Sequence, residues 1–433
     1  MTKGEMLKKV FAECPDLVVL HGHEGFPDNV PSDVDVVATE RTLTKLKRMV
    51  ESRELNLIQI LQHEASCYYW VFYDWDKDNN IEFLHLDLAL DYRRDGRVFF
   101  RAEELLSYKR LYKGFIPVLQ PAYQFSYYTV KKLAKGQLDD RHAEQLTRIY
   151  QEDPEGCARA LARFLPEEDL HTILRAVETG DWSPVRRGIK ELRAALLKKV
   201  AAARPLDRLI YLVGEGLRRA KRALQPTGLV VAFLGMDGSG KSTIAKLVGE
   251  DLLPAFRRKK LLHLRPSLRR KRTTAPATNP HGKPARGPLP SVAKLLYWWL
   301  ENVLGWAVEV FPAKVRSTLL LFDRYYPDLL VDPKRYRYGG PQGLVKMLGT
   351  IVPKPDLYIL LDLPAEVAVA RKREVPLEEA VKLRERYLEV LNNLPNGYIV
   401  DATKPKDEVK SAVERIVLEH MQARAEGRLG IKR

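Results

Sequence analysis

The sequence predicts an α/β protein: a C-terminal parallel sheet with flanking helices, a helical middle segment and a small N-terminal α+β domain. From Leu229 onward, apolar runs of strand length alternate with helical patterns, as in a parallel sheet with helical crossovers. Between residues 102 and 224 the pattern is almost entirely helical with breaks at prolines, whereas earlier residues mix strand-like and helical runs. Since 433 residues suffice for two or three domains, we expect domains at 1–100, 101–225 and 226–433.

The N-terminal domain is predicted to contain short strands, one amphipathic helix and a pair of longer strands. The short strands are expected at 17–20 and 34–37, and the helix at 44–52. The paired strands, 67–73 and 81–90, are separated by a polar turn.

Two aspartates, Asp33 and Asp35, are spaced i and i+2 at the second of these strands and therefore face the same side of it. Two carboxylates directed at one volume repel each other, and a divalent metal ion bound by both would remove this repulsion. Asp87 lies on a later predicted strand, where it can present a third carboxylate. These residues are therefore candidate metal ligands.

This arrangement resembles the nucleotidyltransferase superfamily, in which a strand and Gly-Ser precede Ser-Asp-x-Asp and a third aspartate follows on a later strand. The resemblance implies that Asp33, Asp35 and Asp87 hold Mg²⁺ ions for nucleotidyl transfer. Gly22-His23 stands where the family has Gly-Ser, which removes the serine hydroxyl that would contact a triphosphate. The N-terminal domain is expected either to perform a linked nucleotidyl transfer or to bind the same substrate as the C-terminal domain.

A glycine-rich segment at 235–243 reads Gly-Met-Asp-Gly-Ser-Gly-Lys-Ser-Thr and joins the apolar strand 229–234 to a helical pattern. Such a loop directs backbone N–H groups at phosphate oxygens, and the helix N-terminus adds partial positive charge. Lys241 can reach the β- and γ-phosphates, and the Ser242 hydroxyl can bind Mg²⁺. We therefore expect ATP and Mg²⁺ as cofactors, with nucleotide-binding residues Gly235, Gly238, Ser239, Gly240, Lys241, Ser242 and Thr243.

A second apolar strand, 319–322, ends in Asp323-Arg324-Tyr325. A carboxylate at the C-terminal end of a parallel strand lies in the same crevice as the phosphate loop, so Asp323 can hold the Mg²⁺ shell. Arg324 beside it can bind a second phosphate through two hydrogen bonds. A further strand, 355–362, runs into a helix that ends in the cations Arg371, Lys372 and Arg373.

In this order, these motifs resemble the thymidylate kinase family of nucleoside monophosphate kinases over residues 228–420. The family pattern is Gly-x-Asp-Gly-x-Gly-Lys-Ser-Thr, then Asp-Arg-Tyr, then Pro-Asp-Leu with a strand, Leu-Asp and an arginine-bearing helix. The resemblance implies that Asp237 faces the phosphate acceptor and that Arg324 binds the acceptor phosphate. It also implies that Arg371 and Arg373 close over the transferring phosphoryl group, so the expected catalytic residues are Lys241, Asp237, Asp323, Arg324, Arg371 and Arg373.

The acceptor half departs from the family pattern. Residues 261–266 keep Arg265 and a proline but lack the acid that the family has between them. The segment after Asp323-Arg324-Tyr325 is longer and more basic than a thymidylate site requires, with tyrosines between the cations. Arg335 and Arg337 in this segment are either substrate contacts or a solvated turn. The expected substrate-binding residues are Arg265, Arg324, Tyr325, Arg335 and Arg337.

The net charge of +16 is unevenly distributed, because nine lysines and arginines fall between Arg257 and Arg272 with no acid among them. Such a cluster beside a phosphate loop suits phosphorylated substrates or an anionic surface. A nucleic-acid partner is the lesser alternative, and peripheral membrane contact stays open. The role of the basic, proline-rich loop 257–290 is not fixed by its sequence.

The chain carries no membrane-spanning or signal pattern. Its first residues lack an apolar signal core, and its most apolar stretch, 295–311, contains Glu301 and Glu309. The three cysteines, Cys14, Cys67 and Cys157, are too far apart for a metal site and are typical of reduced thiols. We expect a cytoplasmic protein, with a homodimer as its candidate assembly.

The leading functional hypothesis is an ATP-dependent phosphotransferase that acts on a phosphorylated or hydroxyl-bearing small molecule. A true thymidylate kinase, which would convert dTMP and ATP to dTDP and ADP, is one alternative. A nucleic-acid end-processing or binding protein is another, and a nucleotide-switched regulatory module is a third. The two-part architecture resembles proteins associated with bacterial surface-polysaccharide gene sets, although the sequence names no sugar.

Overall fold

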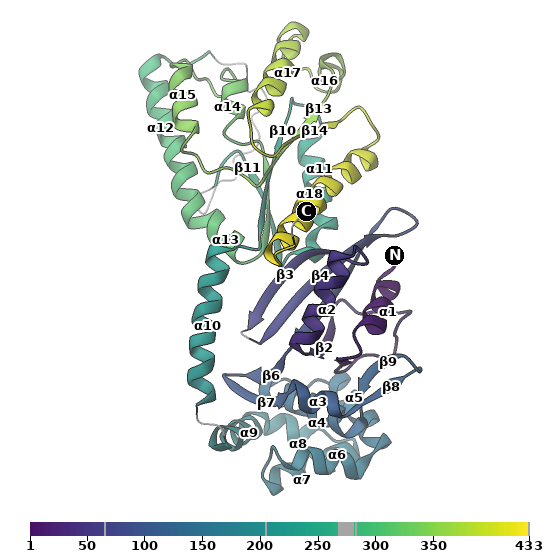
Figure 1. The fold of residues 1–433 in the computed structure, drawn as a ribbon. Coiled ribbons are helices and arrows are strands. Elements are labelled where there is room, and N and C mark those ends of the chain that lie inside the picture. The colour runs from purple at the N-terminus through teal and green to yellow at the C-terminus, as the bar shows by residue number, and fades with distance from the viewer. Residues whose placement is uncertain (65, 204–205, 267–280, 282–283, 432–433) are drawn as a thin grey trace. The chain divides into compact units, whose positions relative to one another are not determined.

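The computed structural model describes residues 1–64, 66–203, 206–266, 281 and 284–431. They form two compact units, Met1–Lys221 with Gln422–Arg433, and Arg222–Met421 (Figure 1). The mixed architecture, with a parallel sheet flanked by helices in the second unit, confirms the predicted α/β class. The predicted basic run Arg269, Arg270, Lys271 and Arg272 lies outside the described residues.

The first unit contains a seven-stranded mixed sheet in the order β3-β4-β5-β2-β1-β9-β8. Because β2 and β5 are parallel neighbours, Asp35 lies opposite Asp87 in the register. Helices α1 (Lys3–Glu13) and α2 (Glu40–Glu51) bury their apolar sides in a core that the sheet shares. The strands are β1 (Leu17–Val19), β2 (Val34–Ala38), β3 (Asn56–Glu64), β4 (Cys67–Trp75), β5 (Ile81–Ala89), β8 (Lys109–Tyr112) and β9 (Ile116–Leu119).

The helical pattern predicted from residue 102 is interrupted by the hairpin β8–β9. Lys113 and Gly114 both have positive φ and form its turn, and β9 is fully buried beside β1. A short hairpin, β6 (Asp91–Arg94) with β7 (Arg97–Arg101), precedes this region. The helices are α3 (Ala102–Ser107), α4 (Pro121–Lys135), α5 (Asp140–Glu152), α6 (Pro154–Ala162), α7 (Glu167–Thr179), α8 (Ser183–Arg187), α9 (Ile189–Ala203) and α10 (Asp207–Leu224).

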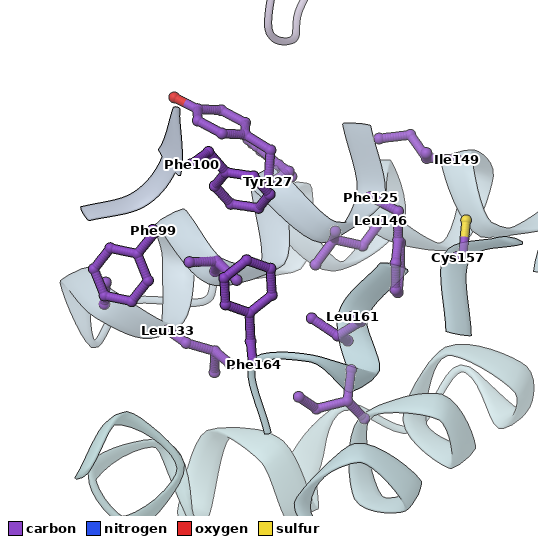
Figure 2. Packing of buried hydrophobic residues seen from close by; sticks show 14 of the residues in the cluster. Phe99, Phe100, Phe125, Tyr127, Leu133, Leu146, Ile149, Cys157, Leu161 and Phe164 are labelled. Atoms are coloured by element: carbon purple, nitrogen blue, oxygen red, sulfur yellow. The ribbon is translucent and has the colours of Figure 1, made fainter. Parts of the chain in front are cut away.

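A second core of the first unit lies between α4 and the surrounding helices. Figure 2 shows Phe100, Tyr127 and Phe164 gathered in it, with ring centroids of Phe100 and Phe164 4.8 Å apart. Burial of such aromatic side chains, each roughly 150–250 Å², fixes the position of α4. As a result, Lys131 on the same helix is held close to the sheet.

The last residues of the chain complete the first unit. Ala425, near the end of α18 (Lys406–Arg428), belongs to the core beneath the seven-stranded sheet, and Leu429 packs against it. The hydroxyl of Tyr73 on β4 also donates to the side-chain oxygen of Gln422 at 3.1 Å. The second unit is therefore inserted, in sequence, within the first.

The second unit is built on a five-stranded parallel sheet in the order β11-β12-β10-β13-β14. Its central strands are continuous apolar runs, as expected when helices cover both faces of a parallel sheet. The carboxyl end of β10, between β12 and β13, is where such sheets open a ligand crevice. The strands are β10 (Leu229–Leu234), β11 (Arg258–His263), β12 (Thr318–Asp323), β13 (Leu357–Asp362) and β14 (Gly397–Asp401).

Helices connect these strands as the alternating pattern predicted. They are α11 (Lys241–Asp251), the 3₁₀ turn η1 (Leu253–Ala255), α12 (Pro288–Gly305), the π-helical η2 (Trp306–Val310), α13 (Phe311–Val315), α14 (Asp328–Val331), α15 (Gln342–Gly349), α16 (Ala365–Arg371), α17 (Leu377–Asn392) and α18. Across the described residues, none of the helices has the length and apolar character that a membrane crossing needs.

Candidate active site

The predicted phosphate-binding loop follows β10 directly and leads into α11. Gly235, Gly238 and Gly240 have φ angles of 134°, 85° and 89°, a backbone region that residues with a Cβ rarely adopt. A Cβ on Gly235 would also lie 2.7 Å from the carbonyl oxygen of Leu361. Only glycine therefore allows this loop to curl, and the N-terminus of α11 adds partial positive charge where an anion would bind.

Lys241, the first residue of α11, is buried beneath the loop. Its Nζ donates to the carbonyl oxygen of Met236 at 2.7 Å, which keeps the ammonium beside the loop. Burial, together with the positive charge of Arg324, lowers the pKa of Lys241 to about 8. A lysine in this position can neutralise phosphate charge while it remains protonated.

Ser242 and Asp323 meet between the start of α11 and the carboxyl end of β12. The Ser242 hydroxyl donates to the Asp323 carboxylate, and Nδ1 of His263 lies 3.9 Å from the same carboxylate. Hydroxyl and carboxylate oxygens are the hard ligands that Mg²⁺ prefers. Ser242 and Asp323 therefore fit the predicted magnesium ion, which would neutralise phosphate charge when bound.

Asp237, within the loop, lies between two guanidinium groups. Nη2 of Arg324 donates to one of its oxygens, and Nη1 of Arg335 donates to the other. Burial alone would raise the pKa of Asp237, but a hydrogen bond with Glu374 and the charge of Arg324 hold it well below its usual range. The structure thus brings three predicted site residues into direct contact.

A buried carboxylate that the motifs did not indicate, Asp328 on α14, holds the other side of Arg324. Nη1 of Arg324 donates to Asp328 at 2.8 Å and to the Tyr387 hydroxyl at 3.2 Å. The hydroxyls of Tyr336 and Tyr387 each donate to Asp328 at 2.5 Å. Burial acts to raise the pKa of Asp328, but the Arg324 guanidinium keeps it below its usual range. Arg324 is therefore fixed by its neighbours before any ligand binds.

A small cavity opens beside Asp237. Glu374 in its wall accepts from Nη1 of Arg335 at 3.1 Å, and Nε2 of His281 lies 2.9 Å from the Asp332 carboxylate. Guanidinium groups and carboxylates at one cavity suit a ligand with an anionic group and hydroxyl groups. The charged residues of its lining are Asp237, His281, Arg324, Asp332, Lys372 and Glu374.

The two predicted lid arginines lie at the end of α16. Arg371 is exposed, and its Nη1 lies 3.5 Å from the carbonyl oxygen of Gly238 in the phosphate loop. Arg373 is also exposed, two residues further along the chain. Arg371 is thus close to the loop, and both guanidiniums are accessible to a ligand.

Four of the five predicted substrate-binding residues, Arg335 among them, are not part of the described lining of this cavity. Nε of Arg265 is 2.6 Å from the Glu301 carboxylate. Tyr325 is buried, and its hydroxyl donates to the carbonyl oxygen of Pro353 at 2.6 Å. Nε of Arg337 donates to the carbonyl oxygen of Pro284 at 3.0 Å. In the described structure, only Arg324 and Arg335 of the predicted acceptor set reach Asp237.

In the first unit, Asp35 is held by Lys131 and His21. Nζ of Lys131 lies 3.1 Å from Oδ1 of Asp35 and 2.8 Å from Nε2 of His21. The same His21 nitrogen lies 3.0 Å from Oδ2 of Asp35. Burial acts to raise the pKa of Asp35, but His21 and Lys131 hold it well below its usual range. A lysine ammonium thus supplies the positive charge that the sequence had led us to expect from a metal ion.

The other two predicted metal ligands of the first unit make different contacts, although Asp87 lies opposite Asp35 in the register of β2 and β5. Asp33 is exposed and accepts from the Ser32 hydroxyl at 2.9 Å, and Asp87 lies 2.8 Å from the Cys67 sulfur. Burial and the charge of Asp35 raise the pKa of Asp87 to about 6. Among the residues that the structure describes, no three His, Cys, Asp or Glu side chains are grouped to hold a metal ion. Metal binding by Asp33, Asp35 and Asp87 therefore stays a prediction from the sequence.

Comparisons with known proteins point to one kind of enzyme. No protein-family model matches the chain. The chain is 30% identical over 215 residues to the probable thymidylate kinase 1 of Saccharolobus solfataricus, which covers 44% of this chain and 98% of that protein. It is also 30% identical over 209 residues to a thymidylate kinase of Xanthomonas campestris pv. campestris, covering 45% and 85% of the two chains. A solved thymidylate kinase from Ehrlichia chaffeensis is similar with 15% identity and a TM-score of 0.32, covering 44% of this chain and 100% of its own.

Proposed function

Because this chain belongs to the thymidylate kinase family, we propose that its second unit transfers the γ-phosphate of ATP to a small molecule of the nucleoside monophosphate class. The observation that carries this proposal is the position of Asp237, held between Arg324 and Arg335 and close to the phosphate loop that contains Lys241. Donor and acceptor contacts therefore converge on one crevice, as phosphoryl transfer requires.

On the donor side, the loop 235–240 would bind the ATP phosphates through its backbone N–H groups. Lys241 would neutralise charge on the transferring group, and Ser242 with Asp323 would hold Mg²⁺. Arg371 and Arg373, which are exposed to solvent, would stabilise the negative charge of the phosphoryl group during its transfer. These roles need no covalent intermediate, because positioning and charge neutralisation account for most of this catalysis.

On the acceptor side, Arg324 and Arg335 would bind an anionic group, and Asp237 would accept from an acceptor hydroxyl. In the described state both guanidiniums are paired with Asp237, so binding of a phosphate would exchange part of that pairing. Arg324 keeps its position during this exchange because Asp328 and Tyr387 hold it from the other side. Thymidine monophosphate is the first acceptor to test, since the named relatives are thymidylate kinases.

The test is a mass-spectrometric assay of the purified chain with ATP, Mg²⁺ and separate nucleoside monophosphates, sugars and sugar phosphates. We expect a phosphorylated nucleoside product, with a Lys241→Ala variant at least about a thousandfold slower. Lys246→Ala is the matched control, because Lys246 is an exposed lysine on the same helix. Unchanged turnover in Lys241→Ala, or phosphorylation of sugars alone, would contradict the proposal.

Nucleotidyl transfer by the first unit stays a prediction from its sequence. The contacts of Lys131 with Asp35 mean that a metal ion could bind Asp35 only after this ammonium moves away. The comparisons give no support to a second activity, since the matched residues cover less than half of the chain. The test adds UTP, CTP and dTTP to the same acceptor panel and measures pyrophosphate release. If the first unit transfers nucleotidyl groups, the wild type should release pyrophosphate and the Asp33→Ala/Asp35→Ala variant should not.

A further inference from the structure

Polar side chains of helix α10 contact strands of the first unit, whereas most of its apolar side chains are exposed. Nη1 of Arg218 donates to the carbonyl oxygen of Gln62 at 3.0 Å, and Nη2 is paired with Glu215 at 2.6 Å. Asp207 accepts from the backbone N–H of Val98 at 3.4 Å. These contacts fix the rotation of the helix about its axis, so its leucines are directed outward.

The outward side of α10 is a broad apolar surface. At 100° per residue, its apolar side chains cover an arc of about 160°. Their exposed fractions are between 57% and 69%, whereas Leu296, Leu300 and Leu304 on the apolar helix α12 are 44% or 45% exposed. We call this surface the α10 apolar face; it consists of Leu206, Leu209, Ile210, Leu212, Val213 and Leu217.

Cations border the α10 apolar face on both sides. Arg219 and Lys221 are exposed and lie at its two edges on the helical wheel. Residues 207–224 carry five lysines and arginines against Asp207 and Glu215, which gives 5 − 2 = +3 for the helix. A broad apolar arc between cationic borders is the pattern of helices that lie in the plane of a bilayer surface.

A lipid surface fits this face better than a second copy of the helix does. A two-helix seam needs only a narrow apolar stripe with a 3.5-residue repeat, and here the arc is far wider. Two copies would also bring their cationic borders together, while anionic lipid headgroups attract them. Since no described helix can cross a membrane, contact through α10 would be peripheral.

We propose that α10 binds the surface of an anionic lipid bilayer, with the α10 apolar face among the acyl chains and Arg219 and Lys221 among the headgroups. This interaction is independent of the phosphotransfer proposed above, because α10 contributes no residue to the cavity beside Asp237. It places the first unit, through the polar side of the helix, on the aqueous side of the headgroups.

The experiment is co-sedimentation of the full chain with vesicles of phosphatidylcholine and phosphatidylglycerol in a three-to-one ratio. We expect binding that weakens as salt rises, since headgroup attraction is screened. A Leu209→Gln/Val213→Gln variant should bind about a hundredfold more weakly, from about tenfold per apolar side chain. Arg219→Gln/Lys221→Gln should bind about twenty-five-fold more weakly, from about fivefold per cation.

Leu296→Gln/Leu300→Gln on α12 is the matched control, because it removes the same kind of exposed side chain from another helix. It should bind vesicles like the wild type, and thermal unfolding should show that every variant is folded. Three results would overturn the proposal: equal sedimentation with and without vesicles, loss of binding in the α12 variant alone, or wild-type binding by the Leu209→Gln/Val213→Gln variant. Self-association abolished by that variant, without vesicle binding, would instead identify a second copy as the occupant.

Discussion

Arg324 and Asp328 form an ion pair with Nη1 and Oδ2 2.8 Å apart, and neither side chain is more than 3% exposed. Charges buried this deeply are tolerated only when further hydrogen bonds satisfy them. Here the Arg324 guanidinium also donates to Asp237, and the Tyr336 and Tyr387 hydroxyls donate to the Asp328 carboxylate. Arg324 is therefore held rigidly although it directly follows the end of β12.

Asp328→Asn removes the charge of this pair and nearly preserves its size. We expect it to lower the free energy of unfolding of the second unit by about 3 kcal/mol, because Arg324 loses a buried counter-charge. We also expect a higher KM for the acceptor with an unchanged KM for ATP, measured by steady-state kinetics. Asp356→Asn, which breaks the ion pair with Lys314 (2.6 Å) instead, should destabilise the unit without affecting the acceptor KM. An unchanged acceptor KM in Asp328→Asn would contradict this role.

The lowered pKa of Lys241 predicts a pH limit on nucleotide capture. Lysine binds phosphate as the protonated ammonium, and its pKa in the free protein is about 8. Hence kcat/KM for ATP should fall as pH rises through about 8, because this ratio reports groups of the free enzyme. Rates measured between about pH 6 and 10 test this. Lys241→Arg should be slower but should lack the decline near pH 8, since guanidinium keeps its proton. The same decline in Lys241→Arg would assign the pH limit to another group.

Substitutions of Arg335 and Arg337 test whether each arginine contacts the substrate or only belongs to a turn. Arg335→Gln removes a guanidinium that donates to Asp237 and Glu374, so we expect the acceptor KM to rise about ten- to a hundredfold. Arg337→Gln loses the donation to the Pro284 carbonyl, which is not at Asp237, so its acceptor KM should stay within about twofold. Steady-state kinetics with varied acceptor concentration measure both KM values. Equal effects of the two substitutions would show that the loop, and not Arg335 itself, sets affinity.

Asp87 should make the first unit less stable as pH rises. Its folded pKa of about 6 lies above the usual value of 3.8, so its stabilising contribution is fully present below about pH 4 and is lost as pH passes 6. Asp87→Asn should therefore raise the free energy of unfolding at pH 8 by about 1–2 kcal/mol and change little at pH 4. Urea unfolding at the two pH values measures this. If Asp87→Asn is less stable than the wild type at pH 8 only when Mg²⁺ is present, then Asp87 binds the metal ion, as its motif predicted.

The residues proposed for the donor half of the site could be predicted from local motifs, because they are adjacent in the chain or lie at one edge of the sheet. The loop 235–240 and Lys241 are contiguous, and Asp323 meets Ser242 because neighbouring parallel strands end at one edge. The acceptor half depends on residues brought together from distant segments. Tyr387 on α17 contacts Arg324, and Glu374 between α16 and α17 contacts Arg335, although no sequence spacing relates these partners.

Pairing between distant residues also explains what the sequence could not reveal in the first unit. Asp33 and Asp35 suggested a metal because their spacing shows two like charges but not the lysine that compensates one of them. Lys131 lies 96 residues beyond Asp35, on a helix whose position is set by the aromatic core around Tyr127. The hairpin β8–β9 was missed for a similar reason, since its second strand is defined by burial beside β1.

The insertion of the second unit within the first has a consequence for how the protein is made. A chain that grows from its N-terminus emerges from the ribosome with residues 1–221 long before Gln422, Ala425 and Leu429 have been synthesised. The seven-stranded sheet must therefore wait for its last packing partners until the inserted unit has been translated, whereas residues 222–421 are contiguous and can fold as soon as they emerge. The first unit is therefore the unit whose translation starts earlier and whose folding is completed later.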